Sequence, residues 1–90
     1  MGKAVKNLFV GNLDSKVTQA ELRRLFEGCG PVAQVHVIVD RDTGLPRHAF
    51  VEMINDADAE AAIQGLNGST LRDRALIVEY ARPRPERPAA

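Results

Sequence analysis

Apolar residues alternate with other residues in four segments of the chain, and this period of two predicts four β-strands, each with one buried face. The segments are residues 7–13, Val32–Val39, His48–Ile54 and 75–80. The positions expected to face the core are Leu8, Val10, Leu13, Val35, Val37, Ala49, Val51, Met53, Leu76 and Val78. A polar turn over residues 40–47 separates the second and third segments, as expected for strands that pair with one another.

A helix is predicted between the first two strands. Thr18 and Glu21 have the spacing of a capping box, in which each side chain binds a backbone amide of the first turn. The helix should end near Gly28, since Pro31 follows and cannot continue it. Its apolar residues, spaced for one helical face, are Leu22, Leu25 and Phe26.

A second helix is predicted between the third and fourth strands. It should begin at Asn55 or Asp56, since both side chains suit a helix N-terminus, and end at the turn Asn67–Gly68. Its apolar face consists of Ala59, Ala62, Ile63 and Leu66. The second helix therefore also has one side to bury.

The predicted order of elements is βαββαβ. Two helices of about ten residues can cover only one face of a four-stranded antiparallel sheet, which predicts an α+β sandwich of the ferredoxin-like class. We expect one domain over residues 1–82 and a flexible tail rich in arginine and proline over residues 83–90, since proline disfavours both helices and central strands.

Two aromatic residues fall on the strand positions that should face solvent. Phe9 and Phe50 alternate with the core positions of the first and third strands, and His48 shares the side of Phe50. The inverted assignment would bury these rings and expose four aliphatic side chains instead. A core does not need exposed rings, whereas a surface that stacks on flat ligands does.

The two strands also carry recognisable motifs. Leu8–Leu13 follows the pattern aliphatic, aromatic, aliphatic, any residue, Asn, Leu, and Ala49–Met53 follows the end of an eight-residue pattern, with Met53 in its last aromatic place. Together they resemble the paired motifs of the RNA recognition motif (RRM) family over residues 6–82. His48 stands where Phe or Tyr is usual, and the glycine expected between Arg47 and His48 is absent.

The resemblance implies that single-stranded RNA binds with its bases stacked on the sheet. Phe9 would stack on one base and Phe50 on a neighbouring base or sugar, while His48 would contact sugars and Arg47 a phosphate. Tyr80 is expected to face outward with them. The full set of residues implicated in RNA binding is Phe9, His48, Phe50, Arg47, Tyr80, Arg82 and Arg74.

The composition limits the expected mode of binding and the expected cellular location. The net charge is zero, which argues against binding nucleic acid mainly through charge but leaves binding through stacking open. No apolar run approaches the roughly 20 residues that cross a bilayer, and the N-terminus is too polar for a signal peptide. Cys29 is the sole cysteine, so no internal disulfide is expected. We expect a cytoplasmic monomer without a metal, a cofactor or a membrane partner.

A fold of this class allows three functions. The first is binding of single-stranded RNA, with single-stranded DNA left open and a role as RNA chaperone or post-transcriptional regulator suggested by the family alone. The second is a protein interaction module of the same fold, favoured by the zero charge, the altered second motif and the exposed Ile38. The third is a small enzyme such as an acylphosphatase, which lacks a convincing anion-binding constellation in residues 14–17. We therefore expect no enzymatic activity.

Overall fold

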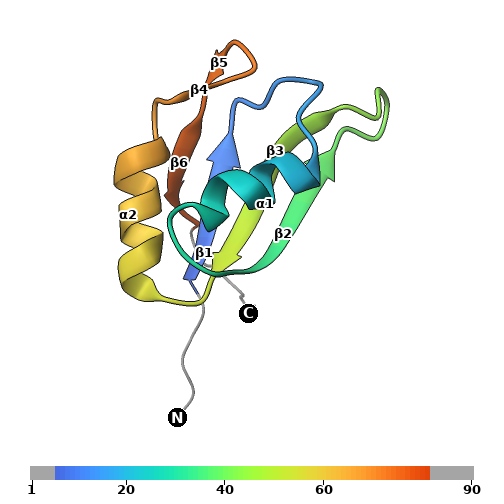
Figure 1. The fold of residues 1–90 in the computed structure, drawn as a ribbon. Coiled ribbons are helices and arrows are strands. Elements are labelled where there is room, and N and C mark those ends of the chain that lie inside the picture. The colour runs from blue at the N-terminus through green and yellow to red at the C-terminus, as the bar shows by residue number, and fades with distance from the viewer. Residues whose placement is uncertain (1–5, 82–90) are drawn as a thin grey trace, which may run out of the picture.

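The computed structural model describes residues 6–81, and in Figure 1 both helices lie on the same side of one sheet. The four main strands form an antiparallel sheet in the order β2-β3-β1-β6. The elements are β1 (Lys6–Gly11), α1 (Gln19–Glu27), β2 (Val32–Val39), β3 (Pro46–Met53), α2 (Asp56–Leu66), β4 (Thr70–Leu71), β5 (Arg74–Ala75) and β6 (Ile77–Tyr80). The ferredoxin-like βαββαβ prediction is confirmed. The predicted tail of residues 83–90 lies outside the described residues.

The core lies between the sheet and the helices. Every inward position predicted on the strands is buried except Val37, which packs half-buried against the core. Both helices contribute their apolar faces, as their residue spacing predicts. The buried core residues are Leu8, Val10, Leu13, Val17, Leu22, Phe26, Val32, Val35, Ala49, Val51, Met53, Ala59, Ala62, Leu76 and Val78.

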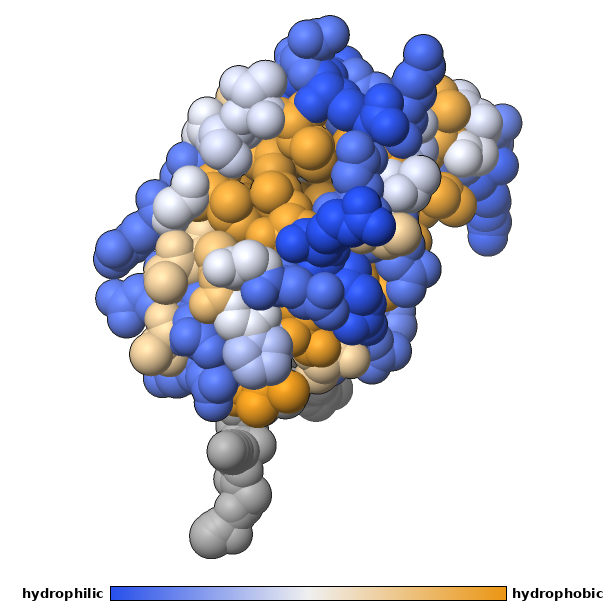
Figure 2. All heavy atoms as spheres, viewed as in Figure 1, coloured by the Kyte–Doolittle hydropathy of each residue, from blue (hydrophilic) through white to orange (hydrophobic). Residues whose placement is uncertain are grey.

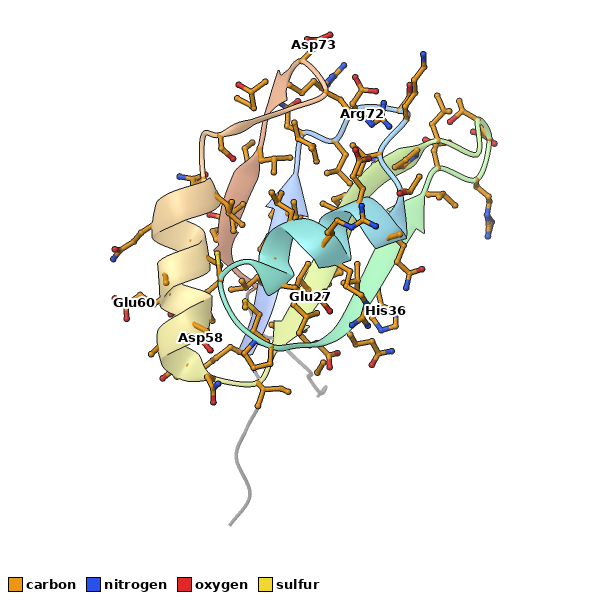
Figure 3. All side chains as sticks on the ribbon, viewed as in Figure 1. Glu27, His36, Asp58, Glu60, Arg72 and Asp73 are labelled. Carbon is orange, nitrogen blue, oxygen red and sulfur yellow. The ribbon has the colours of Figure 1, made fainter. Side chains whose placement is uncertain are left out.

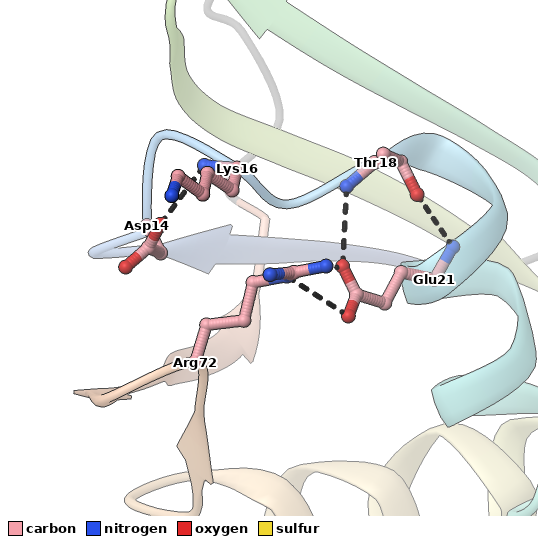
Figure 4. Close-up of polar contacts among 5 residues, drawn as sticks. All are labelled: Asp14, Lys16, Thr18, Glu21 and Arg72. Carbon is pink, nitrogen blue, oxygen red and sulfur yellow. Dashed lines mark hydrogen bonds and ion pairs between the residues drawn. The ribbon is translucent and has the colours of Figure 1, made fainter.

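The capping box at the start of α1 is confirmed, and a third residue, Arg72, binds to its carboxylate (Figure 4). Thr18 Oγ1 accepts from the Glu21 amide at 3.1 Å, and Glu21 Oε1 accepts from the Thr18 amide at 3.4 Å. The same carboxylate accepts from Arg72 Nε at 3.0 and 3.1 Å. Glu21 therefore caps α1 and also ties it to the segment between β4 and β5.

The first strand is shorter than predicted. β1 ends at Gly11 because Asn12 has a φ of 60°, a left-handed conformation that asparagine tolerates better than most residues and that interrupts an extended strand. Leu13 nevertheless returns to the core and is buried, so its predicted side is confirmed.

The prediction of one continuous strand over residues 75–80 is wrong. Arg74 and Ala75 form β5, which pairs with β4 in a separate hairpin, and only Ile77–Tyr80 joins the main sheet. Arg72 and Asp73, which form the turn, have φ angles of 51° and 71°. Positive φ at both central residues fits a tight two-residue hairpin, and Figure 3 shows both side chains at its tip.

We expect Thr18→Ala to lower the free energy of unfolding by about 0.5–2 kcal/mol, because the mutation removes the oxygen that caps α1. Urea denaturation would measure the loss. Ser15→Ala is the matched control, since this hydroxyl in the preceding loop makes no hydrogen bond within residues 6–81. An equal effect of both substitutions would contradict the role of the cap.

Candidate functional site

Three rings form a cluster on the face of the sheet that the helices leave uncovered. The ring centroids of Phe9 and His48 lie 5.4 Å apart, those of Phe9 and Phe50 lie 5.9 Å apart, and those of His48 and Phe50 lie 5.5 Å apart. The rings are mutually tilted or edge-to-face, as aromatic pairs prefer. The predicted side of all three residues is confirmed, since each is half-buried, both neighbours of Phe9 and of Phe50 are buried, and so is Ala49 beside His48.

Strand register defines the surface around the cluster. Phe9 pairs directly with Phe50 on β3 and with Glu79 on β6, and Phe50 pairs with His36 on β2. Directly paired residues share a side of the sheet. We call this side the ring face, and its residues are Asn7, Phe9, Gly11, Gln34, His36, Ile38, His48, Phe50, Glu52, Ile77 and Glu79.

Gly11 lies beneath the ring of Phe9. A Cβ atom at Gly11 would be 2.8 Å from Cε2 and 3.0 Å from Cζ of Phe9, closer than real contacts allow. Gly11 lies two residues after Phe9 and therefore on the same side of β1, where the Phe9 ring covers it and leaves it buried. The missing side chain therefore lets the Phe9 ring lie across its own strand.

Arg47 lies at an irregularity in β3. Ile38 pairs with His48 but Val39 pairs with Pro46, so Arg47 is an extra residue in the register, as in a β-bulge. Its side chain is largely exposed, and its Nη1 lies 4.0 Å from Asp40 Oδ2. At this distance and exposure the pair holds Arg47 weakly.

Arg74 lies in β5 and reaches the loop after β1. Its Nη1 donates to Asn12 Oδ1 at 3.0 Å, and Asn12 Nδ2 donates to the Ala75 carbonyl at 2.7 Å. Asn12 thus bridges two segments far apart in sequence, a role that was not predicted. Its place as the expected asparagine of the motif Leu8–Leu13 and the tolerance of asparagine for positive φ were signals for it.

Both arginines line one hollow at the end of the sheet, with a volume of about 450 Å³. Asp14 lines it too and adds one opposing charge. The structure therefore brings Arg47 and Arg74 together, which the sequence did not predict. The lining residues are Asn12, Leu13, Asp14, Ser15, Leu45, Pro46, Arg47 and Arg74.

The prediction that Tyr80 faces outward with the rings is wrong. Tyr80 pairs with the buried Leu8, so it belongs to the helix side of the sheet, where it remains exposed at the end of β6. Partial desolvation and the carboxylates of Asp56 and Glu60 on α2 raise the pKa of its phenol above 10. The alternation of Leu76, Val78 and Tyr80 already indicates that Tyr80 lies on the helix side, since residues two apart share a side.

The remaining predicted residue, Arg82, lies outside the described residues. Within residues 6–81, no group of three or more histidine, cysteine, aspartate or glutamate side chains is arranged to hold a metal ion. The same stretch contains no helix of the length and apolarity that crossing a membrane requires.

Comparison with known proteins assigns the family. A family model described as the RNA recognition motif matches residues 8–77, which include both motif strands and both helices. The chain belongs to the RNA recognition motif family. Its matched region begins at Leu8 and ends at Ile77, so the ring cluster and both arginines of the hollow lie inside this RRM.

Relatives identified by sequence support the same family assignment. RbpE of Nostoc sp. is 44% identical over 84 residues, which cover 92% of this RRM chain and 85% of RbpE. A Sex-lethal homolog of Chrysomya rufifacies is 42% identical and covers 86% of this chain, but this chain spans only 25% of that protein.

Two solved structures have the same fold at similar identity. The crystal structure of RNA Binding Protein PG1 superposes with a TM-score of 0.81 at 40% identity, covering 90% of this chain and 99% of that one. The Sxl-lethal protein/RNA complex superposes with a TM-score of 0.83 at 38% identity, covering 92% of this chain and 50% of that one. The second of these structures contains RNA.

We expect Gly11→Ala to displace the Phe9 ring while the fold is retained. Gly11 does not have a positive φ, so alanine is compatible with its backbone, and the atoms it would meet belong to the movable end of a side chain. Nuclear Overhauser contacts between Phe9 and the rings of His48 and Phe50 should weaken in the variant.

Gly65→Ala serves as the control, because a Cβ atom there has no atom of another element within 4 Å. Its ring contacts should match those of the unmodified protein. Unchanged ring contacts in Gly11→Ala would show that Phe9 does not depend on the glycine.

Proposed function

We propose that this RRM binds short single-stranded RNA by stacking bases on Phe9 and Phe50, with His48 against the sugars between them. The observation that carries the proposal is the ring cluster on the uncovered face, with centroids 5.4–5.9 Å apart. Family membership supports RNA as the ligand, and solved relatives of the same fold include a complex with RNA. In this proposal the domain is a binding module and carries out no catalytic step.

Stacking alone supports weak to moderate affinity. Each stacked base contributes roughly 1–3 kcal/mol, so two bases stacked on the phenyl rings would contribute about 2–6 kcal/mol before ordering costs. A micromolar Kd requires about 8 kcal/mol. Contacts beyond the rings are therefore needed for affinity in the micromolar range.

Positive charge is placed beside the rings instead of among them. No lysine or arginine occupies the ring face, whereas Arg47 and Arg74 line the hollow at the end of the sheet. We propose that these two side chains contact phosphates of a strand leaving the rings. Arg82 remains a further proposed contact, while Tyr80, on the helix side, is omitted from the proposed site.

The finer assignments rest on the family resemblance. We propose a single domain over residues 1–82 that acts as a monomer in the cytoplasm, as an RNA chaperone or a regulator of transcripts. Single-stranded DNA is a second candidate ligand, since stacking on aromatic rings does not require the 2′-hydroxyl group.

One observation favours protein binding as a second function. Figure 2 shows apolar surface on the helix side, between α1 and α2. Half-buried residues of these helices and of β4, which pack against the core without being covered, are Leu25, Ile63, Leu66 and Leu71. A partner protein could cover them without touching the ring face.

Titration with short RNA oligomers, followed by the backbone amide spectrum, tests the proposal. We expect shifts centred on Phe9, His48 and Phe50, and much smaller shifts with duplex RNA, whose bases are already stacked and paired. No shifts at millimolar RNA would contradict RNA binding and turn attention to the helix side. Shifts confined to Ile63 and Leu66 would contradict stacking on the sheet.

Phe50→Ala should weaken RNA binding by roughly 1–3 kcal/mol with little loss of stability, because the mutation removes one stacking ring from a half-exposed position. Ile77→Ala is the matched control, since it removes an apolar side chain from the same face without removing a ring. Calorimetric Kd values and urea denaturation measure the two effects. Unfolding of Phe50→Ala would contradict the assigned side of β3.

The affinity should depend only weakly on salt. Single-stranded nucleic acid gives a slope of log K against log salt near −0.7 per phosphate neutralised, so two contacts predict about −1.4 and three about −2. Measuring the Kd over a series of NaCl concentrations gives the slope. A slope steeper than about −4 would show that charge, and not stacking, dominates binding.

A further inference from the structure

We infer that the ring face discriminates among bases and prefers guanine to uracil, because Glu79 and Glu52 flank the two phenyl rings. This inference rests on the proposed function, since it names the preferred ligand of the same surface. Stacking on a ring accepts any base, whereas the two glutamates would decide which base is preferred there.

Register places a carboxylate next to each ring. Glu79 on β6 is the direct partner of Phe9 on β1, and directly paired residues have Cβ atoms about 4.5–5.5 Å apart. Glu52 follows Phe50 by two residues on β3, so it points to the same side. A base stacked on either ring therefore has a carboxylate near its edge.

Both carboxylates are available to a ligand. Within residues 6–81, neither Glu52 nor Glu79 takes part in an ion pair or in a side-chain hydrogen bond. Glu79 is exposed and Glu52 half-buried. Among the described residues, the ring face carries no lysine or arginine that would neutralise them.

An ionised carboxylate only accepts hydrogen bonds, so it selects for donors on the base. Guanine offers two adjacent donors on its Watson–Crick edge, N1–H and N2–H₂, which match the two carboxylate oxygens. Uracil offers a single N3–H between two carbonyl oxygens. A carboxylate repels these two oxygens. Adenine and cytosine each offer one exocyclic amine beside a ring acceptor, and are intermediate.

The two amides of the ring face do not favour a particular base. Asn7 and Gln34, the direct partners of Glu52, carry amides that both donate and accept. They can adapt to any base edge by rotating the amide. Of these side chains, the two glutamates select for donors on the base, since an ionised carboxylate only accepts hydrogen bonds.

The test compares four RNA hexamers with one variable base in a uridine background, UUUXUU, where X is G, A, C or U. We expect the G hexamer to bind about tenfold more tightly than the all-U hexamer, the scale of one good bidentate contact. Glu79→Gln should reduce this ratio to about twofold, since an amide can also donate to uracil oxygens. Glu52→Gln provides a second variant on the central strand.

Glu60→Gln is the matched control, because it makes the same change of charge on α2, which lies on the helix side (Figure 3). Its ratio should equal that of the unmodified protein. Equal binding of all four hexamers, or an unchanged ratio in both ring-face variants, would overturn the base preference and leave RNA binding standing. Failure of all four to bind would overturn the proposed function as well.

Discussion

Two helices cannot cover both sides of a four-stranded sheet, and the rest of the molecule follows from this constraint. The covered side contains most of the aliphatic residues of the strands, among them the buried Leu8, Val10, Val51 and Val78. The uncovered side must remain in contact with water and yet carries Phe9, Phe50 and His48. The three rings partly cover one another, and the ring of Phe9 also covers Gly11, so mutual contact reduces the apolar area left exposed.

The charged side chains near the rings are also divided by sign between two parts of the surface. Carboxylates lie on the ring face, at Glu52 and Glu79, while Arg47 and Arg74 line a hollow at the end of the sheet. A net charge of zero is thus compatible with a local separation of charge. A nucleic acid strand would meet negative charge beside its bases and positive charge beside its phosphates, which makes the local arrangement more informative than the total.

Small side-chain bridges hold the end of the sheet in shape. Asn12 binds both Arg74 and the Ala75 carbonyl, and Arg72 binds the carboxylate of Glu21 that caps α1. The short β4–β5 hairpin contributes little to the core, since its four residues are exposed or half-buried. These bonds instead fix the position of Arg74, which lines the same hollow as Arg47.

The sequence by itself determined the order of elements, the cap of α1, the buried side of each strand and the exposure of the rings. These features depend on residues close in sequence, through the periods of two and 3.6 and through local hydrogen bonds. The side of Tyr80 was also encoded in that alternation, although the prediction placed it wrongly. Only the tertiary structure decided what lies across strands: Glu79 beside Phe9, Asn12 on Arg74, and Arg47 in the same hollow as Arg74. Such neighbours depend on strand order, register, a bulge and a hairpin turn without glycine, because contacts between residues far apart in the sequence leave no periodic trace in the chain.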